Sequence, residues 1–245
     1  RQRQMCIRDR LYTGKAKQVF ATDDPDVLWM TYTNQATALN GEKKAQIAHK
    51  GELNRAISTL LFKELTAAGI PTHYIDSPDA TTMIVKKATM LPLEVVVRNY
   101  ASGHFVTKFN VKPMMKLDPP IHEYYYKSDE LGDPFMNEAQ IFALHEATPE
   151  QLKQVRALTD RVNAYLTKRF DEVGITLVDF KLEYGTLTDG TLVLADELSP
   201  DNFRLVDQKT GDSLDKDVFR QARGPLTPVY EEVLARLQEK GAAHV

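Results

Sequence analysis

The alternation of charged and apolar side chains over residues 178–184 constrains the fold of this chain more than any other feature. Asp179, Lys181 and Glu183 alternate with apolar residues. This is the period of a β-strand, so the three charges share one face. An Asp-Gly pair at 189–190, a strong signal for a two-residue turn, precedes a second apolar segment. The sequence therefore predicts a β-hairpin with one charged face.

If Asp189 and Gly190 form a two-residue turn, the register places Glu183 opposite Asp196 on the same face, whereas a loop of three or four residues would break this pairing. Two carboxylates in that position destabilise a sheet, so a cation is expected between them. One candidate is the ammonium group of Lys181. The other is Mg²⁺, which favours one or two carboxylates together with substrate phosphates. An antiparallel strand with one solvated face would explain the same alternation without any function.

Composition excludes several classes of protein. The chain has 245 residues, of which 42% are hydrophobic and 27% charged, as in a globular protein of one or two domains. It contains no apolar run long enough to span a membrane. Its net charge of −3 argues against a dedicated nucleic-acid binder. The single cysteine, Cys6, excludes an internal disulfide, so we expect a cytoplasmic protein.

The clearest predicted helix follows Thr148. Thr148 is the expected N-cap, Pro149 the first helical residue, Gln151 the partner in a capping box and Gly174 the end of the helix. Strand patterns dominate the N-terminal part, and strands and helices mix in the remainder. This order predicts an α+β fold with mainly antiparallel sheets.

Three segments are expected along the chain. Residues 1–10 carry charge without a strand or helix pattern, and we predict that they are a disordered lead-in or a sequence artefact. Residues 11–90 would form a small β-rich domain and residues 91–245 a larger α+β domain. Small-molecule sites often lie in a cleft between two such domains.

The segment Gly-Lys-Ala-Lys at 14–17 is a candidate phosphate-binding turn. Gly14 is suited to a tight turn, and Lys15 and Lys17 follow on one face. The segment lacks the second glycine and the Ser/Thr of a Walker A loop. An edge strand whose lysines block aggregation would explain the segment equally well.

Two arginines lie beside segments typical of anion sites. Arg98 ends a buried strand and precedes a loop of small residues, an arrangement suited to phosphate or carboxylate, although it could simply pair with Glu94. Arg204 follows a turn that Ser199 and Asp201 could cap, and that alternative would leave Arg204 on the surface.

Taken in order, these motifs resemble the SAICAR synthetase family. The matching segments are GKAK at 14–17, LPLEVVVRN at 91–99, VDFKLEYG at 178–185, ADELSPD at 195–201 and LDKDVFRQ at 214–221. The resemblance covers about residues 11–240. It implies a two-domain α+β fold related to ATP-grasp proteins, with mainly antiparallel sheets and a nucleotide cleft between the domains.

The resemblance also implies an activity. Members of the family are ATP-dependent ligases of de novo purine synthesis. They join the carboxylate of CAIR, a phosphorylated aminoimidazole ribotide, to the amine of L-aspartate, which gives SAICAR, ADP and phosphate. The implied cofactors are ATP and Mg²⁺, and the implied assembly is a homodimer or a larger homo-oligomer without nucleic-acid or membrane partners. A small-molecule kinase and a non-catalytic nucleotide-binding relative remain alternatives.

Roles for individual residues follow from the same resemblance. The catalytic residues would be Lys15, Asp179 and Lys181, and the Mg²⁺ ligands Glu183 and Asp196. The residues that bind ATP would be Gly14, Lys15, Lys17, Met90, Leu91 and Lys127. The residues that bind CAIR would be Arg98, Ser102, His104, Lys181 and Arg204. The resemblance also implies that the small domain, residues 11–90, covers ATP and that the larger one, residues 91–245, holds the metal and CAIR site.

Two positions depart from the family pattern. Gln35 stands where many relatives have an acidic residue. The loop that ends in Gly-Ser in the family ends here in Gly103-His104, which removes a phosphate-binding hydroxyl. Ser102 or a protonated His104 could replace it, or His104 could only cap the loop.

Overall fold

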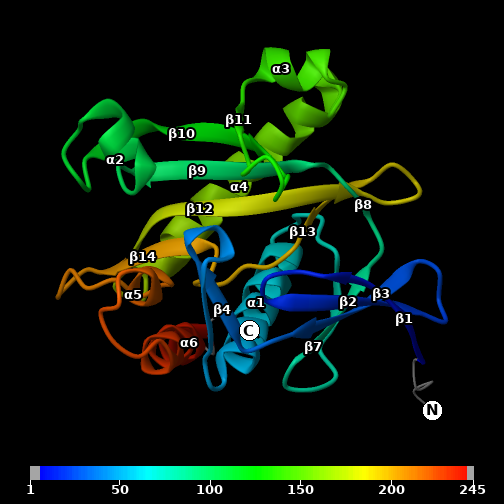
Figure 1. Cartoon of the computed structure of the whole chain (residues 1–245), viewed down its shortest axis with the longest axis horizontal. Coiled ribbons are helices and arrows are strands. Elements are labelled where there is room, and N and C mark those ends of the chain that lie inside the picture. Colours follow the sequence, from blue (N-terminus) through cyan, green and yellow to red (C-terminus); the bar gives the residue numbers. More distant parts are fainter. Residues whose placement is uncertain (1–5, 242–245) are drawn as a thin grey trace.

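The N-terminal part of the chain forms a five-stranded antiparallel sheet. The computed structural model describes residues 6–241. In sheet order the strands are β1 (Ile7–Thr13), β2 (Lys17–Thr22), β3 (Val27–Tyr32), β7 (Thr82–Lys86) and β6 (Tyr74–Asp76). In Figure 1 this sheet lies below the second sheet, and the chain passes from one to the other through β8.

Strand β1 corrects the prediction for the start of the chain. Residues 7–10, expected in a disordered lead-in, belong to this strand, and Arg10 pairs with Phe20 of β2. All seven side chains of β1 are exposed, so the strand is held by backbone pairing and leaves no apolar alternation in the sequence. Of the rest of the predicted lead-in, Cys6 is exposed and precedes the strand, and residues 1–5 lie outside the described residues.

The second sheet has seven strands, with the long strand β12 (Ile175–Thr186) at its centre. On one side follow β9 (Leu93–Tyr100), β10 (Lys116–Tyr126) and β11 (Phe135–Met136). On the other side β12 pairs with β13 (Leu192–Ala195) and β14 (Phe203–Asp207). The short strand β8 (Thr89–Met90) pairs with the end of β12 on the same side as β9, opposite β13. A separate hairpin consists of β4 (Gln35–Ala38) and β5 (Lys43–Gln46). Every strand pair in these sheets is antiparallel, as predicted.

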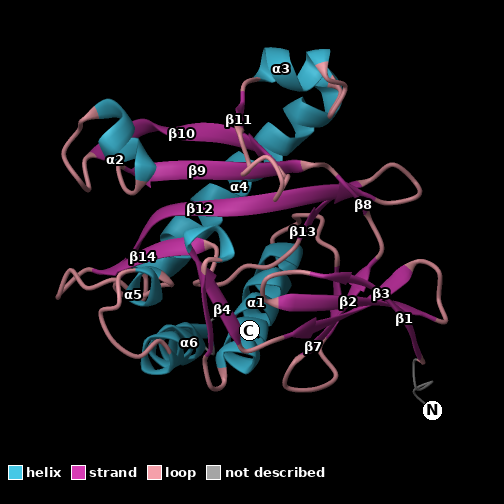
Figure 2. Ribbon diagram, viewed as in Figure 1, coloured by secondary structure: helices cyan, strands magenta, loops and turns pink. Residues whose placement is uncertain are grey.

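Three long helices cover the sheets: α1 (Lys50–Ala67), α4 (Pro149–Asp171) and α6 (Thr227–Gly241) (Figure 2). The short ones are η1 (Leu39–Gly41), α2 (His104–Phe109), α3 (Glu138–Ala143) and α5 (Asp217–Arg220). Helix α4 begins with the predicted capping box: the Thr148 hydroxyl accepts from the Gln151 N–H at 3.1 Å, and the Gln151 side chain accepts from the Thr148 N–H at 3.0 Å. None of the helices in residues 6–241 combines the length and the apolar character needed to cross a membrane.

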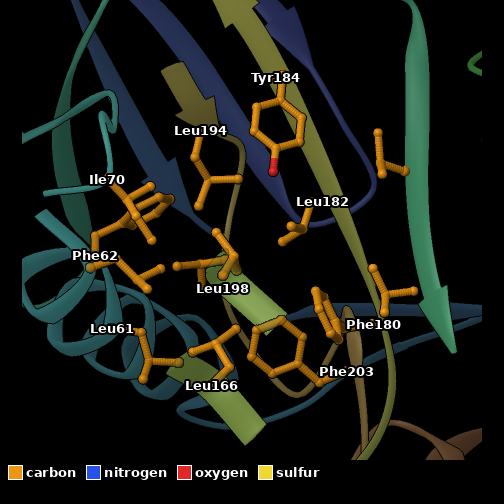
Figure 3. Packing of buried hydrophobic residues seen from close by; sticks show 14 of the residues in the cluster. Leu61, Phe62, Ile70, Leu166, Phe180, Leu182, Tyr184, Leu194, Leu198 and Phe203 are labelled. Carbon is orange, nitrogen blue, oxygen red and sulfur yellow. The ribbon is translucent and has the colours of Figure 1, made fainter. Parts of the chain in front are cut away.

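One hydrophobic core connects the two sheets. In Figure 3, Phe62 of α1 and Leu166 of α4 lie on the same side of β12 as Phe180. Phe203 of β14 makes edge-to-face contacts with Phe170 and Phe180, with ring centroids 5.9 Å apart in each pair. The chain passes from the first sheet to the second near residue 90, where we propose the domain boundary, while the core crosses that boundary.

The β12–β13 hairpin has a register shifted by one residue from the predicted one. Glu183 pairs with Ala195, and Asp196 lies beyond the end of β13. The loop has three residues, because the Leu187 N–H donates to the Thr191 carbonyl at 2.9 Å. Its last residue, Gly190, has a φ of +86°. A type I turn followed by a left-handed residue accommodates Asp-Gly as well as a two-residue turn does, so the sequence alone could not separate the two.

Candidate active site

A pocket of about 450 Å³ lies between the N-terminal sheet and the face of the second sheet that carries Asp179, Lys181 and Glu183. Both sheets contribute walls, since the β1–β2 turn faces β9, β12 and the segment that follows β13. The predicted site residues that line it are Gly14, Lys15, Lys17, Arg98, His104, Lys127, Asp179, Lys181, Glu183, Asp196 and Arg204. Residues from distant parts of the sequence are thus brought to one site.

The two predicted metal ligands lie near each other despite the shifted register. Asp196 follows the last residue of β13 and has a left-handed φ of +59°, so the backbone turns at this point. Its carboxylate then shares a cation with Glu183: the Lys181 ammonium is 3.1 Å from Glu183 Oε2 and 3.8 Å from Asp196 Oδ2. A second lysine, Lys127, is 2.5 Å from Glu183 Oε1. The charged face of β12 is therefore covered and ion-paired, and it is not a solvated face.

The two carboxylates have opposite shifts in pKa. Burial raises the pKa of Glu183, and the charge of Asp196 adds to this effect. Burial also acts to raise the pKa of Asp196, but the charges of Lys17 and Lys181 outweigh it and hold that pKa well below its ordinary value. Asp196 is consequently the more strongly ionised member of the pair.

The two lysines of the β1–β2 turn have different environments. The Lys17 side chain is 13% exposed, and its ammonium is 2.7 Å from both Asp196 Oδ1 and Glu197 Oε1. It starts β2, an internal strand, so a role as an aggregation-blocking edge residue is excluded. Lys15 is half exposed, with an ammonium 3.9 Å from Asp129. Lys17 is fixed in the wall of the pocket, while Lys15 lies at its mouth.

Glu197 is a pocket residue that the sequence analysis missed. Its side chain is buried, and it accepts hydrogen bonds from Lys17 and from the Ser199 hydroxyl, both at 2.7 Å. If β13 continued, strand alternation would point Glu197 and Asp196 to opposite faces. The left-handed backbone at Asp196 removes that alternation, and a sequence gives little warning of such a bend.

Arg98 and Arg204 form a second wall around Asp179. Arg98 is 3.2 Å and Arg204 3.1 Å from the same oxygen, Asp179 Oδ2. Arg98 also donates to Glu123 at 2.7 Å. Its acidic partners are thus Asp179 and Glu123, and the alternative prediction that it pairs with Glu94 is wrong. The Arg204 side chain is 25% exposed and also pairs with Asp217 at 3.0 Å, which excludes a free surface position. Burial is the largest influence on the Asp179 pKa and raises it, although both arginines oppose the shift.

Gly103 fits closely against this wall. Its φ is +56°, and a Cβ placed there would be 2.9 Å from both terminal nitrogens of Arg204. The next residue, His104, begins α2 and lines the pocket. Ser102 does not line it. The loop therefore brings backbone, rather than a serine hydroxyl, next to the guanidinium.

Comparison with known proteins identifies the family of this chain. Residues 10–237 match the model of the SAICAR synthetase family. The chain is 93% identical over 235 residues to the phosphoribosylaminoimidazole-succinocarboxamide synthase of Lacticaseibacillus paracasei, covering 96% of this chain and 98% of that protein. The chain belongs to the SAICAR synthetase family. It is also 48% identical over 227 residues to the enzyme of that name from Bacillus subtilis, covering 93% of this chain and 94% of the relative.

Solved structures of SAICAR synthetases share this fold. The enzyme from Ehrlichia chaffeensis superposes with a TM-score of 0.92 at 41% identity, over 94% of this chain and 98% of that one. A SAICAR synthetase in complex with ADP superposes with a TM-score of 0.90 at 43% identity, over 92% and 96% of the two chains. The predicted α+β fold of the family is confirmed.

Several residues expected from the SAICAR synthetase pattern lie away from the pocket. Met90 pairs with Gly185 in the second sheet, and the Leu91 N–H donates to the Tyr184 carbonyl at 2.9 Å. This N–H is therefore not available to an adenine. Gln35 lies in β4, where its backbone carbonyl accepts from Lys50 at 2.9 Å, and it does not line the pocket.

The donor set of the pocket fits Mg²⁺. Glu183 and Asp196 offer hard carboxylate oxygens on one wall, and Mg²⁺ commonly takes one or two carboxylates plus phosphate oxygens and water. Within residues 6–241 no group of three or more His, Cys, Asp or Glu side chains forms a complete metal cage. The pocket therefore suits a metal ion that is held by two carboxylates and completes its coordination with oxygens of a phosphorylated ligand.

Proposed function

We propose that this pocket carries out the ATP-dependent joining of CAIR to L-aspartate that defines the SAICAR synthetase family. The observation that carries the proposal is the convergence of three groups in one pocket: the lysines of the β1–β2 turn, the Glu183–Asp196 pair and the Arg98–Asp179–Arg204 wall. The ADP complex of a 43% identical family member supports nucleotide binding at this fold.

The chemistry accounts for these residue types. A carboxylate is a poor electrophile, so the CAIR carboxylate would take the γ-phosphoryl group of ATP to give an acyl phosphate and ADP. The amine of L-aspartate would then attack the acyl carbon, form the amide and expel phosphate, with loss of one proton. Phosphoryl transfer depends on positioning and on charge neutralisation more than on a covalent nucleophile. Lysine and arginine side chains supply that neutralisation.

Individual roles follow from the position of each side chain. Arg98 and Arg204 are oriented by Asp179 and would hold the phosphate or the carboxylate of CAIR. Lys15, at the mouth and only loosely paired, can reach the ATP phosphates. Lys17 would neutralise Asp196 and Glu197, and Lys181 would bridge the Glu183–Asp196 pair to the reacting carboxylate.

Mg²⁺ completes the proposed site, with Glu183 and Asp196 as its protein ligands. When bound, it would neutralise charge on the phosphates during transfer. The lysines that now contact these carboxylates keep the two acids close together. We also propose a cytoplasmic homo-oligomer, a location supported by the single cysteine of the chain.

An assay of ADP release tests the proposal. Purified protein with ATP, Mg²⁺, CAIR and L-aspartate should release ADP at full rate only when both co-substrates are present, and mass spectrometry should detect the new amide. A stable phosphorylated product without the amide would instead indicate a kinase. Tight ATP binding without turnover would indicate a non-catalytic relative.

A further inference from the structure

Lys216 differs from the other lysines of the pocket in lacking an acidic partner. Lys15, Lys17, Lys127 and Lys181 each have a carboxylate oxygen within 4.0 Å. Among residues 6–241, no carboxylate lies within that distance of the Lys216 ammonium, although this side chain also lines the pocket. Its charge is therefore available to a ligand.

The acid with the greatest influence on Lys216 is already neutralised. Asp201 Oδ2 is 2.6 Å from the ammonium of the buried Lys50, and Asp201 Oδ1 accepts from the Tyr230 hydroxyl at 2.6 Å. Both oxygens thus have strong partners of their own. Burial lowers the pKa of Lys216 to about 8, and the charges of Arg220 and Lys50 add to the effect. A bound anion would relieve this unfavourable environment.

Arg220 adds positive charge at the same end of the pocket. Its guanidinium is 2.8 Å from Asp217 Oδ1, while Arg204 is 3.0 Å from the other oxygen of the same carboxylate. One carboxylate therefore serves two guanidinium groups. Within the described residues, Asp217 is the only carboxylate within 4.0 Å of either Arg220 or Lys216.

The position of Lys216 connects it to the reacting centre. Its backbone N–H donates to the Pro200 carbonyl at 3.2 Å, which ties it to the segment that begins with Asp196 and Glu197. Asn202 of that segment donates to Asp196 Oδ2 at 3.2 Å. A ligand held by Lys216 would thus lie beside residues 196–202, the segment that carries Asp196 of the carboxylate pair.

We propose that Lys216, assisted by Arg220, binds a carboxylate of the dicarboxylic amino-acid substrate. This inference rests on the proposed function. The nucleotide and CAIR are assigned there to Lys15, Arg98 and Arg204, so the remaining substrate is the amine donor, which carries two carboxylates. The Lys216 ammonium and the Arg220 guanidinium together suit a carboxylate ligand.

Steady-state kinetics of Lys216→Met test this assignment. We expect the KM for L-aspartate to rise about tenfold or more, because a charge-assisted hydrogen bond is lost, while the KM values for ATP and CAIR stay within about twofold of wild type. Lys216→Arg, which retains the charge, should recover most of the affinity for L-aspartate. Lys209→Met, an exposed position outside the pocket, is the matched control and should leave all three constants unchanged.

The outcomes separate this inference from the proposed function. A wild-type protein that forms no amide would contradict the proposed function itself. An active wild type whose Lys216→Met variant keeps its KM for L-aspartate, or changes the KM for CAIR or ATP equally, would overturn the assignment of Lys216 alone. If Lys216→Met does not fold, Lys216→Gln is measured against the same criteria, with ATP binding as the test of folding.

Discussion

Single residues decide how charge is distributed in this site. Asp196 is the clearest case, because one left-handed backbone conformation turns its carboxylate to the face that carries Lys181 and Glu183. In an unbroken strand it would follow the pairing of Ala195 and point toward the core. The pair of carboxylates thus depends on where β13 ends.

Glu183→Gln and Asp196→Asn should each lower Mg²⁺-dependent turnover by about two orders of magnitude, because each removes a charged ligand oxygen from the phosphoryl-transfer site. The fold should change little, since neutralising one carboxylate also relieves the repulsion between them. Turnover across a Mg²⁺ titration, together with thermal unfolding, measures both effects. Full activity of either variant at low Mg²⁺ would show that the carboxylate does not bind the metal.

Gly103→Ala should raise the KM for CAIR, because the added Cβ would lie 2.9 Å from the Arg204 guanidinium and displace it from Asp179. Gly211→Ala is the control: its φ is also positive, +76°, but nothing lies within 4 Å of the added atom. Gly211→Ala should lose about 1 kcal/mol of stability from its positive φ, and Gly103→Ala more, because its φ of +56° with a ψ of −136° is a conformation nearly confined to glycine. Equal KM values for CAIR in the two variants would contradict a role for Gly103 in positioning Arg204.

At the scale of secondary-structure elements, local signals were readable and long-range pairings were not. The capping box of α4 is written in residues 148–151, and the structure has it as predicted. The loop of the β12–β13 hairpin depends on a choice between two turns that accept the same Asp-Gly pair, so its register could not be derived. Strand β1 was missed because its pairing with β2 leaves no apolar pattern.

The free energy of unfolding should depend on pH through Asp207 of β14, which pairs with Arg236 of α6. Backbone N–H groups of the following turn and the Arg236 guanidinium lower the pKa of Asp207 from its ordinary 3.8 to about 2. A lowered pKa means that the carboxylate stabilises the fold above its ordinary value and that this contribution is lost as the pH falls toward about 2.

Denaturant unfolding of wild type and Asp207→Asn at a series of pH values measures this contribution. The wild type should be more stable than the variant above pH 4, and the difference should shrink steadily below it, because the variant lacks the titrating group at every pH. Other carboxyl groups titrate in both proteins and cancel in the comparison. A difference that stays constant from pH 5 to pH 2 would contradict the role of this carboxylate.

At the scale of the whole molecule, function depends on the meeting of two sheets. The alternation of charges in β12 predicted a functional face, and the family resemblance gave its chemistry. The resemblance places Lys17 and Lys127 in the site, but their ion pairs with Asp196 and Glu183 could not be predicted, because the partners are more than 50 positions apart in the sequence. The position of Glu197 could not be predicted because it follows a backbone bend. A ligand-binding role for Lys216 could not be predicted either, because only the folded chain shows which pocket lysine has no carboxylate within 4.0 Å among the described residues.

We propose that one pocket between the two sheets holds ATP, Mg²⁺ and CAIR together. A crystal structure of the protein with a non-hydrolysable ATP analogue, Mg²⁺ and CAIR tests it most directly. We expect Mg²⁺ bound to both Glu183 and Asp196, the analogue's phosphates beside Lys15, and the anionic groups of CAIR on Arg98 and Arg204. A metal bound without either carboxylate, or CAIR bound outside this pocket, would contradict the account.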